Sequence, residues 1–164
     1  MQLSDIDEWN VGALRTISTE LDTELRTVTQ VADELEKVSQ LPGWESPAAD
    51  AARGKIKSVR GNVLDDAAVL GAIQQLAEET AAAVTTLQTK LADLRAAVAS
   101  HNGHLSLSDS GEVSISGTPQ EVAKLQSVAD DLETQAKALI HQAEDIDNDC
   151  AEVFGHVVKG DITA

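Results

Sequence analysis

Carboxylates and imidazoles stand at spacings that could bind a metal ion in two places along the chain. In segment 145–149, aspartates at alternate positions are typical of the start of a calcium-binding loop. Cys150, however, occupies the position of the loop glycine, and His156 that of the bidentate glutamate. An apolar heptad repeat also runs through the segment and directs the aspartates outward on a helix. We therefore expect a solvated helix face and no calcium site.

The second place is a glycine-containing loop in which His101 and His104 stand three residues apart, with Asp109 near in sequence. Zinc accepts imidazole ligands, but a catalytic zinc site needs a third protein ligand and a structural site four. The pattern favours an incidental pair of loop histidines, and we expect no bound metal.

Catalytic motifs are absent from the sequence. Paired acids occur at 65–66, 78–79 and 130–131, but neighbours on a helix diverge by about 100° and cannot share a proton as a dyad does. The chain has no Gly-x-Ser-x-Gly elbow, phosphate-binding glycine loop or His-Glu-x-x-His motif. Cys150, the one cysteine, fits a small apolar residue on a helix seam. We expect a protein that is not an enzyme, with no catalytic residue and no cofactor.

The composition restricts the partners. The chain has 164 residues, which suits one domain over 1–164, and 28 acidic against 12 basic residues give a net charge of −16. Nucleic acid and anionic membrane surfaces would repel such a chain. The N-terminus is acidic and lacks an apolar stretch, so we expect no classical signal peptide and no membrane insertion. The chain is expected to be made in the cytoplasm and, if exported to the envelope or beyond, to leave by a route independent of a signal peptide.

Heptad repeats predict three long helices. A lead-in and first helix are expected over 4–41, with Ser4 and Asp7 as a weak capping box and Trp9 packed at the joint. Its seam is predicted to contain Leu14, Leu21, Val28 and Leu35, alternating with Ile17, Leu25, Ala32 and Val38. The second helix is expected over 47–100, with a seam of Ile56, Val63, Leu70, Ala77, Val84, Leu91 and Val98 and partner positions at Val59, Ile73, Leu87 and Leu94.

A short β-hairpin is predicted over 104–116, because apolar and polar residues alternate on both sides of a glycine-containing turn. Thr118-Pro119-Gln120-Glu121 then combines a cap, a first-position proline and a glutamate three residues on, so the third helix is expected over 118–154. It carries two regular heptad lines, and residues 155–164 are expected to form a flexible tail. The lines are Val122, Ala129, Ala136, Ala143, Cys150 and Leu125, Leu132, Leu139, Ile146, Val153.

The connection at 42–47 contains a tryptophan that a plain turn does not need. Pro42 and Gly43 end the first helix, and Ser46 can cap the second, which begins with Pro47. Trp44 would either plug the open end of the helical hairpin or offer a recognition surface at a fixed corner, and one indole can do both.

Together these elements predict an all-α fold. We expect an elongated antiparallel coiled-coil helical bundle of three long helices, with a small β-hairpin between the second and third. Two-helix stretches cannot bury both flanks of an apolar seam, which predicts a protein partner, either a second copy of the chain or a helical-hairpin heteropartner.

The corner resembles the Trp-x-Gly (WXG) helical-hairpin superfamily of type VII (ESX) secretion, in its longer actinobacterial variant with a β-hairpin and a third helix. The opening Leu3-Ser4-Asp5-Ile6 with Trp9 is also similar to those longer forms. Ser46 stands where the second glycine is typical, and the family's export signal, Tyr-x-x-x-Asp/Glu, has no counterpart because the chain has no tyrosine. The residues that carry the resemblance are Leu41-Pro42-Gly43-Trp44-Glu45-Ser46-Pro47-Ala48-Ala49-Asp50-Ala51-Ala52-Arg53.

The resemblance implies a non-enzymatic protein of type VII secretion that acts as a secreted substrate, partner or targeting module through coiled-coil contacts. Its partners would be a helical hairpin and the secretion machinery, and the corner residues Gly43, Trp44 and Ser46 with Trp9 would form or support the contact site. Export would depend on a partner that carries the tyrosine signal, or this chain would stay in the cell. The alternative function is a cytoplasmic coiled-coil scaffold or chaperone-like adaptor with no role in secretion.

Overall fold

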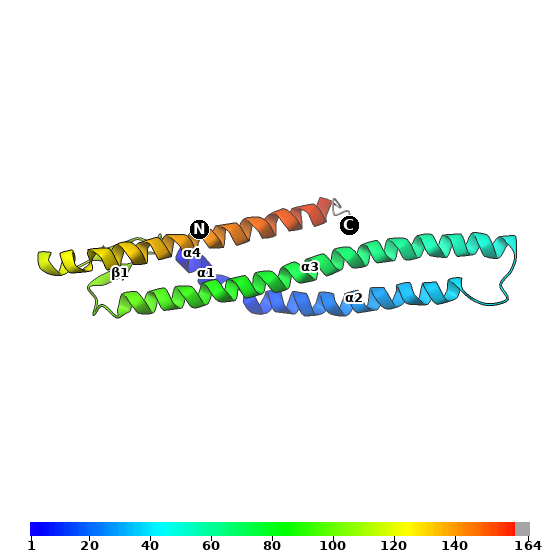
Figure 1. Ribbon diagram of the computed structural model, residues 1–164, viewed down its shortest axis with the longest axis horizontal. Coiled ribbons are helices and arrows are strands. Elements are labelled where there is room, and N and C mark those ends of the chain that lie inside the picture. Colours follow the sequence, from blue (N-terminus) through cyan, green and yellow to red (C-terminus); the bar gives the residue numbers. More distant parts are fainter. Residues whose placement is uncertain (160–164) are drawn as a thin grey trace. The chain divides into compact units, whose positions relative to one another are not determined.

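A computed structural model describes residues 1–159, with the side chains of Phe154 and of 156–159 left aside. It contains four helices and two strands in this described part: α1 (Leu3–Glu8), α2 (Val11–Ser39), α3 (Pro47–Ala99), β1 (Leu105–Leu107), β2 (Val113–Ile115) and α4 (Pro119–Lys159) (Figure 1). The predicted mostly helical fold with a small antiparallel sheet is confirmed.

The chain divides into two compact units. Unit 1 contains Met1–Gly12 and Glu79–Phe154, and unit 2 contains Ala13–Glu78 together with the described residues 155–159. Helix α3 contributes to both, with its first part in unit 2 and its second part in unit 1. The expectation of one domain over 1–164 stays a prediction.

Unit 2 is built on an antiparallel pair of helices, α2 and the first part of α3, which lie side by side in Figure 1. Residues near the end of α2 contact residues near the start of α3. For example, Glu36 Oε2 and Arg60 Nε form an ion pair at 3.1 Å. Residues early in α2 contact residues further along α3, as Ser18 Oγ does with Gln74 Nε2 at 3.1 Å. These contacts fix the register of the pair.

The seam of α2 differs from the prediction at two positions. Ser18 and Ser39 are buried in it, whereas Ile17 and Val38, which we expected there, are 41% and 42% exposed. In the structure, the seam residue that follows Leu14 is Ser18, and the one that follows Leu35 is Ser39, each four positions further on. The same step of four residues leads from 21 to 25 and from 28 to 32. The prediction had taken the more apolar neighbour, at a step of three, and was wrong.

The same correction applies to α3 within unit 2. Val59 was expected in the seam but is 38% exposed, while the next residue, Arg60, points its guanidinium to the Ala32 carbonyl and to Glu36. Ala67 is buried in the seam. Among the described residues of unit 2, the fully buried ones are small, whereas Leu25 and the other large seam residues are half-buried.

Unit 1 has the larger apolar core. The second part of α3 runs antiparallel to α4, with Thr80 beside Cys150 and Lys90 beside Gln142. Both predicted heptad lines of α4 face inward, since their members are buried or half-buried. The buried cluster of unit 1 consists of Leu3, Ile6, Leu87, Leu91, Leu94, Val98, Leu105, Ala129, Leu132, Ala136, Leu139 and Ala143.

The predicted hairpin is confirmed. β1 and β2 pair antiparallel with Leu105 opposite Ile115 and Leu107 opposite Val113, so all four apolar side chains lie on one face and pack against the core of unit 1. The backbone N–H of Val113 donates to Glu133 Oε2 of α4 at 3.1 Å. An isolated two-stranded hairpin is marginal in water, and this packing supplies the support that it needs.

Helix α4 begins as predicted. Thr118 N and Oγ1 both donate to Glu121 Oε2 at 2.7 Å, and Glu121 N donates back to Thr118 Oγ1. Its end was predicted wrongly, because α4 continues to Lys159 rather than stopping at residue 154, which makes 155–159 helix and not a tail. Residues 160–164, the rest of the predicted flexible tail, lie outside the described residues.

Helix α1 is fixed to unit 1 by polar contacts. The predicted Ser4–Asp7 capping box is wrong, because Asp5 Oδ2 accepts from Gln2 N at 2.6 Å and takes that role. Ser4 instead donates to Asp109 of the hairpin turn, from its N–H at 2.8 Å and from its hydroxyl at 2.6 Å. Asp7 pairs with Arg95 of α3 at 2.7 Å. Both residues therefore serve tertiary contacts rather than the helix cap.

Candidate functional site

The backbone of the Trp44 corner is set by two local signals. Gly43 has φ of +77°, a left-handed conformation that favours glycine and that ends the α2 side of the turn. Ser46 Oγ accepts from Ala49 N at 3.1 Å and so caps α3, whose first residue is Pro47. Ser46 thus has a hydrogen-bonding role here that a glycine could not supply.

Trp44 is held by Arg53, which lies in the second turn of α3. The Arg53 guanidinium carbon lies 5.6 Å from the centroid of the indole, within cation–π range. Arg53 Nη2 also donates to the Trp44 carbonyl oxygen, and Nη1 donates to Asp50 Oδ1 at 2.6 Å. Two interactions of Arg53 therefore tie Trp44 to α3, and the contact with Asp50 holds the arginine in place.

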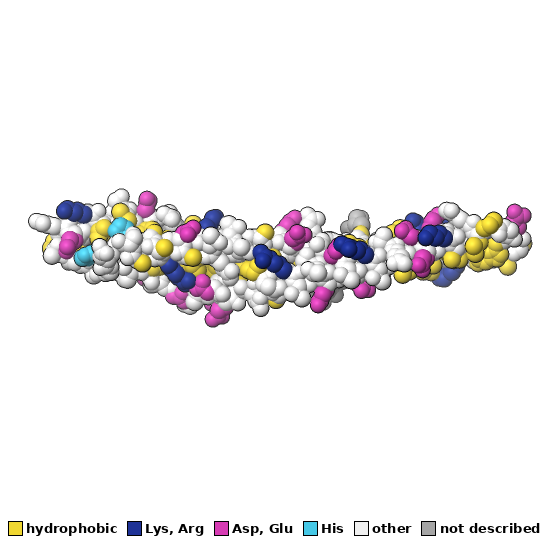
Figure 2. Space-filling model, turned by 90° about the horizontal axis from the view of Figure 1, so that it is seen from below, with side chains coloured by type: hydrophobic (Ala, Val, Ile, Leu, Met, Phe, Trp, Pro, Cys, Tyr) yellow, Lys and Arg dark blue, Asp and Glu magenta, His cyan; other side chains and the backbone are white. Residues whose placement is uncertain are grey.

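The indole is half-buried rather than part of a closed core. Ala49 is buried behind the turn, while Leu41 on the other side of Trp44 is 53% exposed. Figure 2 shows hydrophobic side chains gathered at the end of unit 2 where α2 and α3 are joined. The corner thus combines a capped helix start, a half-buried aromatic ring and an exposed leucine, which are features of a protein-contact surface.

Trp9, the other tryptophan, belongs to unit 1 and not to the corner. It is half-buried and packs against the unit 1 core, and its carbonyl oxygen accepts from Gln88 Nε2 at 3.0 Å. The same Gln88 nitrogen also donates to the Ile6 carbonyl at 3.0 Å. Trp9 therefore marks the junction of α1 with α3, and the structure does not bring it into one site with Gly43, Trp44 and Ser46 within either unit.

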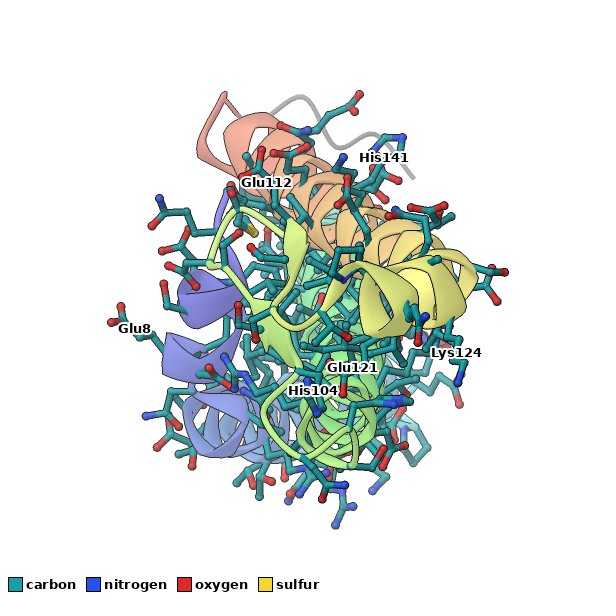
Figure 3. The ribbon with its side chains drawn as sticks, turned by 90° about the vertical axis from the view of Figure 1, so that its left-hand side faces the viewer. Glu8, His104, Glu112, Glu121, Lys124 and His141 are labelled. Atoms are coloured by element: carbon teal, nitrogen blue, oxygen red, sulfur yellow. The ribbon has the colours of Figure 1, made fainter. Side chains whose placement is uncertain are left out.

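The candidate metal ligands whose side chains are described face outward or contact other groups, as Asp109 does with Ser4. Asp145, Asp147 and Asp149 are exposed on α4. His104 Nδ1 is 2.9 Å from the Ser116 carbonyl, and Figure 3 shows this ring beside Glu121 at the start of α4. Within the described part of the chain, no three His, Cys, Asp or Glu side chains are grouped to hold a metal ion.

Cys150 lies on the α3-facing side of α4, half-buried, with its Sγ 3.3 Å from Thr80 Oγ1. A groove of about 520 Å³ runs between α3 and α4 in unit 1, with Leu94 and Leu139 in its floor and Lys90 and Gln142 at its rim. Lys90 Nζ approaches Gln142 Oε1 at 3.4 Å across this rim. Asp93, Ala97, Gln135 and Ala138 complete its lining.

Two glutamates of α4 have a lowered pKa because of hydrogen bonds near the start of the helix and at the hairpin. A salt bridge with Lys137 and the N–H of Val113 lower the pKa of Glu133. Hydrogen bonds from the N–H and hydroxyl of Thr118 lower the pKa of Glu121. Glu133 thereby connects β2 to α4, and Glu121 completes the cap at the start of α4.

Arg53 is the site residue that sequence reasoning missed. Its signal was available, because Asp50 and Arg53 stand three residues apart on a predicted helix and so share a face. Its contact with Trp44 could not be read from spacing, since that contact depends on the path of the turn.

No helix in the described part of the chain is long and apolar enough to cross a membrane. Comparison with protein-family models, with curated proteins and with solved structures finds no match for this chain.

Proposed function

We propose that this chain is a non-enzymatic helical-hairpin protein of type VII (ESX) secretion, which acts as a substrate, partner or targeting module through contacts of its helices. The observation that carries the proposal is the Trp44 corner. There, a left-handed Gly43, a half-exposed indole and a Ser46-capped helix follow one another between two antiparallel helices. This is the arrangement expected of a Trp-x-Gly hairpin, with serine at the second glycine position.

The acidic surface and the lack of grouped metal ligands in the described residues fit a role in protein binding. The bundle itself, with three long helices in an elongated antiparallel arrangement, belongs to the same proposal. It is supported by the antiparallel contacts within unit 2, from Ser18 to Gln74, and within unit 1, from Cys150 to Thr80.

The chain has no tyrosine and so cannot carry a Tyr-x-x-x-Asp/Glu signal of its own. This observation is compatible with two roles. In the first, the chain is exported together with a partner that supplies the signal. In the second, it is a cytoplasmic coiled-coil scaffold that is not exported.

A secretion assay separates these two roles. The tagged chain is expressed in its native host and in an isogenic strain that lacks the ESX ATPase, and its extracellular amount is compared with a cytoplasmic marker. Export that disappears in the ATPase-deficient strain supports the first role. Equal extracellular amounts in both strains, or none in either, would refute type VII export and leave the scaffold role.

A further inference from the structure

One flank of the helix pair in unit 2 carries a set of exposed apolar side chains. On α2, this set contains Ile17, Val31 and Val38, which are 41%, 44% and 42% exposed. Each of them directly precedes a seam residue, at position 18, 32 or 39. On α3, Val59 stands one position before Arg60 and is 38% exposed. In an antiparallel pair, the positions that precede the first core position of each heptad lie on the same side of both helices.

These residues alternate along that side in the observed register. With Glu36 opposite Arg60, the order from the corner inward is Val38, Val59, Val31, then Asp66 and Glu24, then Ile73 and Ile17. Glu24 and Asp66 are exposed, and Ile73 is half-buried. We call this set the apolar flank. It consists of three valines, an acidic pair and two isoleucines.

The heptad line of α3 that forms half of this flank already carries a third helix in unit 1. Val59, Asp66 and Ile73 are spaced by seven, and the line continues through Thr80 to Leu87 and Leu94. Leu87 and Leu94 are only 2% and 3% exposed, because they are buried in the same cluster as Leu132 and Leu139 of α4. These positions of α3 are thus of the kind that receive an amphipathic helix, and in unit 2 Val59 stays exposed.

The acidic pair decides between two occupants of the flank. A second copy of the chain would bring another Glu24 and Asp66 to the interface, and each chain carries a net charge of −16. Like charges at close range oppose that pairing. A helix with lysine or arginine in the middle of an apolar face would bury the valines and neutralise the carboxylates at once.

We propose that the apolar flank of unit 2 binds an amphipathic helix of a partner protein that places basic residues opposite Glu24 and Asp66. The inference rests on the proposed function only in its general form, that the chain acts through helix contacts. It does not depend on export.

The test uses two synthetic helices about four heptads long with identical leucine and alanine faces. One has lysine and the other glutamate at the positions that face Glu24 and Asp66. Binding to the full chain is measured by fluorescence anisotropy. We expect saturable binding of the lysine helix and at least about tenfold weaker binding of the glutamate helix. The double variant Glu24→Lys/Asp66→Lys should reverse this preference.

A matched pair of variants on α3 locates the surface. Val59 and Leu64 are both 38% exposed, but Leu64 follows the seam residue Val63 and so lies on the opposite flank. Val59→Asp should weaken binding of the lysine helix about tenfold or more, and Leu64→Asp should leave it unchanged. Val31→Ser offers a milder change if Val59→Asp lowers helicity in circular dichroism.

Three results would overturn the proposal. They are no saturable binding of the lysine helix, equal effects of the Val59 and Leu64 variants, and a dimer in sedimentation equilibrium that Val59→Asp abolishes. The last result would assign the flank to a second copy. If the chain binds the lysine helix but shows no type VII export, the proposed function alone is refuted. If the chain shows type VII export but does not bind the lysine helix, this inference alone is refuted.

Discussion

Gln74 Nε2 donates a hydrogen bond to Ser18 Oγ at 3.1 Å across the seam of unit 2, at a position where a coiled coil ordinarily has two apolar side chains. Ser18 is buried, and Gln74 also reaches Glu78 Oε2 at 3.3 Å. Such a polar layer fixes the register of a helix pair, because any shift separates the two partners.

The polar layer predicts a non-additive pair of substitutions. Ser18→Ala should lower the free energy of unfolding by about 1 kcal/mol, since it leaves Gln74 without its partner across the seam. Combining it with Gln74→Leu should restore the stability of the wild type or exceed it, because the layer becomes apolar on both sides. Urea unfolding with amide hydrogen exchange of unit 2 measures this. Additive losses in the double variant would show that the two side chains are not coupled.

The two units should differ in their response to a shortened core residue. Leu91 in unit 1 is fully buried, and Leu91→Ala should lower stability by about 2–5 kcal/mol. Leu25 in unit 2 is half-buried, so Leu25→Ala should have a clearly smaller effect. Val128→Ala on the exposed face of α4 is the control and should change stability by less than about 0.5 kcal/mol. Equal losses at Leu91 and Leu25 would contradict the unequal cores described above.

Acid should loosen the joint between the hairpin and α4. The salt bridge with Lys137 and the N–H of Val113 lower the pKa of Glu133 from its usual 4.5. A carboxyl group with a lowered folded-state pKa contributes stability that is present above the unfolded-state value and is lost as the pH falls through the folded-state value. We therefore expect unit 1 to weaken below about pH 4.5.

Carbon-detected NMR of the Glu133 carboxyl group, with urea unfolding at neutral and acidic pH, checks this expectation. In the Glu133→Gln variant, the difference between the two pH values should shrink, since the group no longer titrates. A midpoint for Glu133 at or above 4.5 would contradict the assignment.

Much of the helical organisation follows from the sequence. Both heptad lines of α4 are regular, and the structure places their members inward from Val122 to Val153. The hairpin was also predictable, because alternation around a glycine turn leaves few other conformations. Local signals at Ser46 and Thr118 located the starts of α3 and α4, since capping depends on neighbouring residues alone.

The seam of unit 2 could not be predicted by hydrophobicity. Ile17 and Val38 are more apolar than Ser18 and Ser39, yet the four-residue step of the helix pair buries the serines. The placement of α1 could not be predicted from the sequence either, because Ser4 and Asp7 are also suited to capping their own helix. Their partners Asp109 and Arg95 lie about a hundred residues away and are set by tertiary packing.

The central claim, that the Trp44 corner is a recognition element of type VII export, is tested most directly by the exported fraction of Trp44→Ala in the native host. The substitution removes the indole beneath Arg53 but leaves the Ser46 cap and the buried seam in place. We predict that the extracellular fraction falls about tenfold or more while the thermal midpoint and helicity stay close to those of the wild type. An unchanged extracellular fraction, or a fall that matches a loss of stability, would contradict the claim and return Trp44 to a purely structural role.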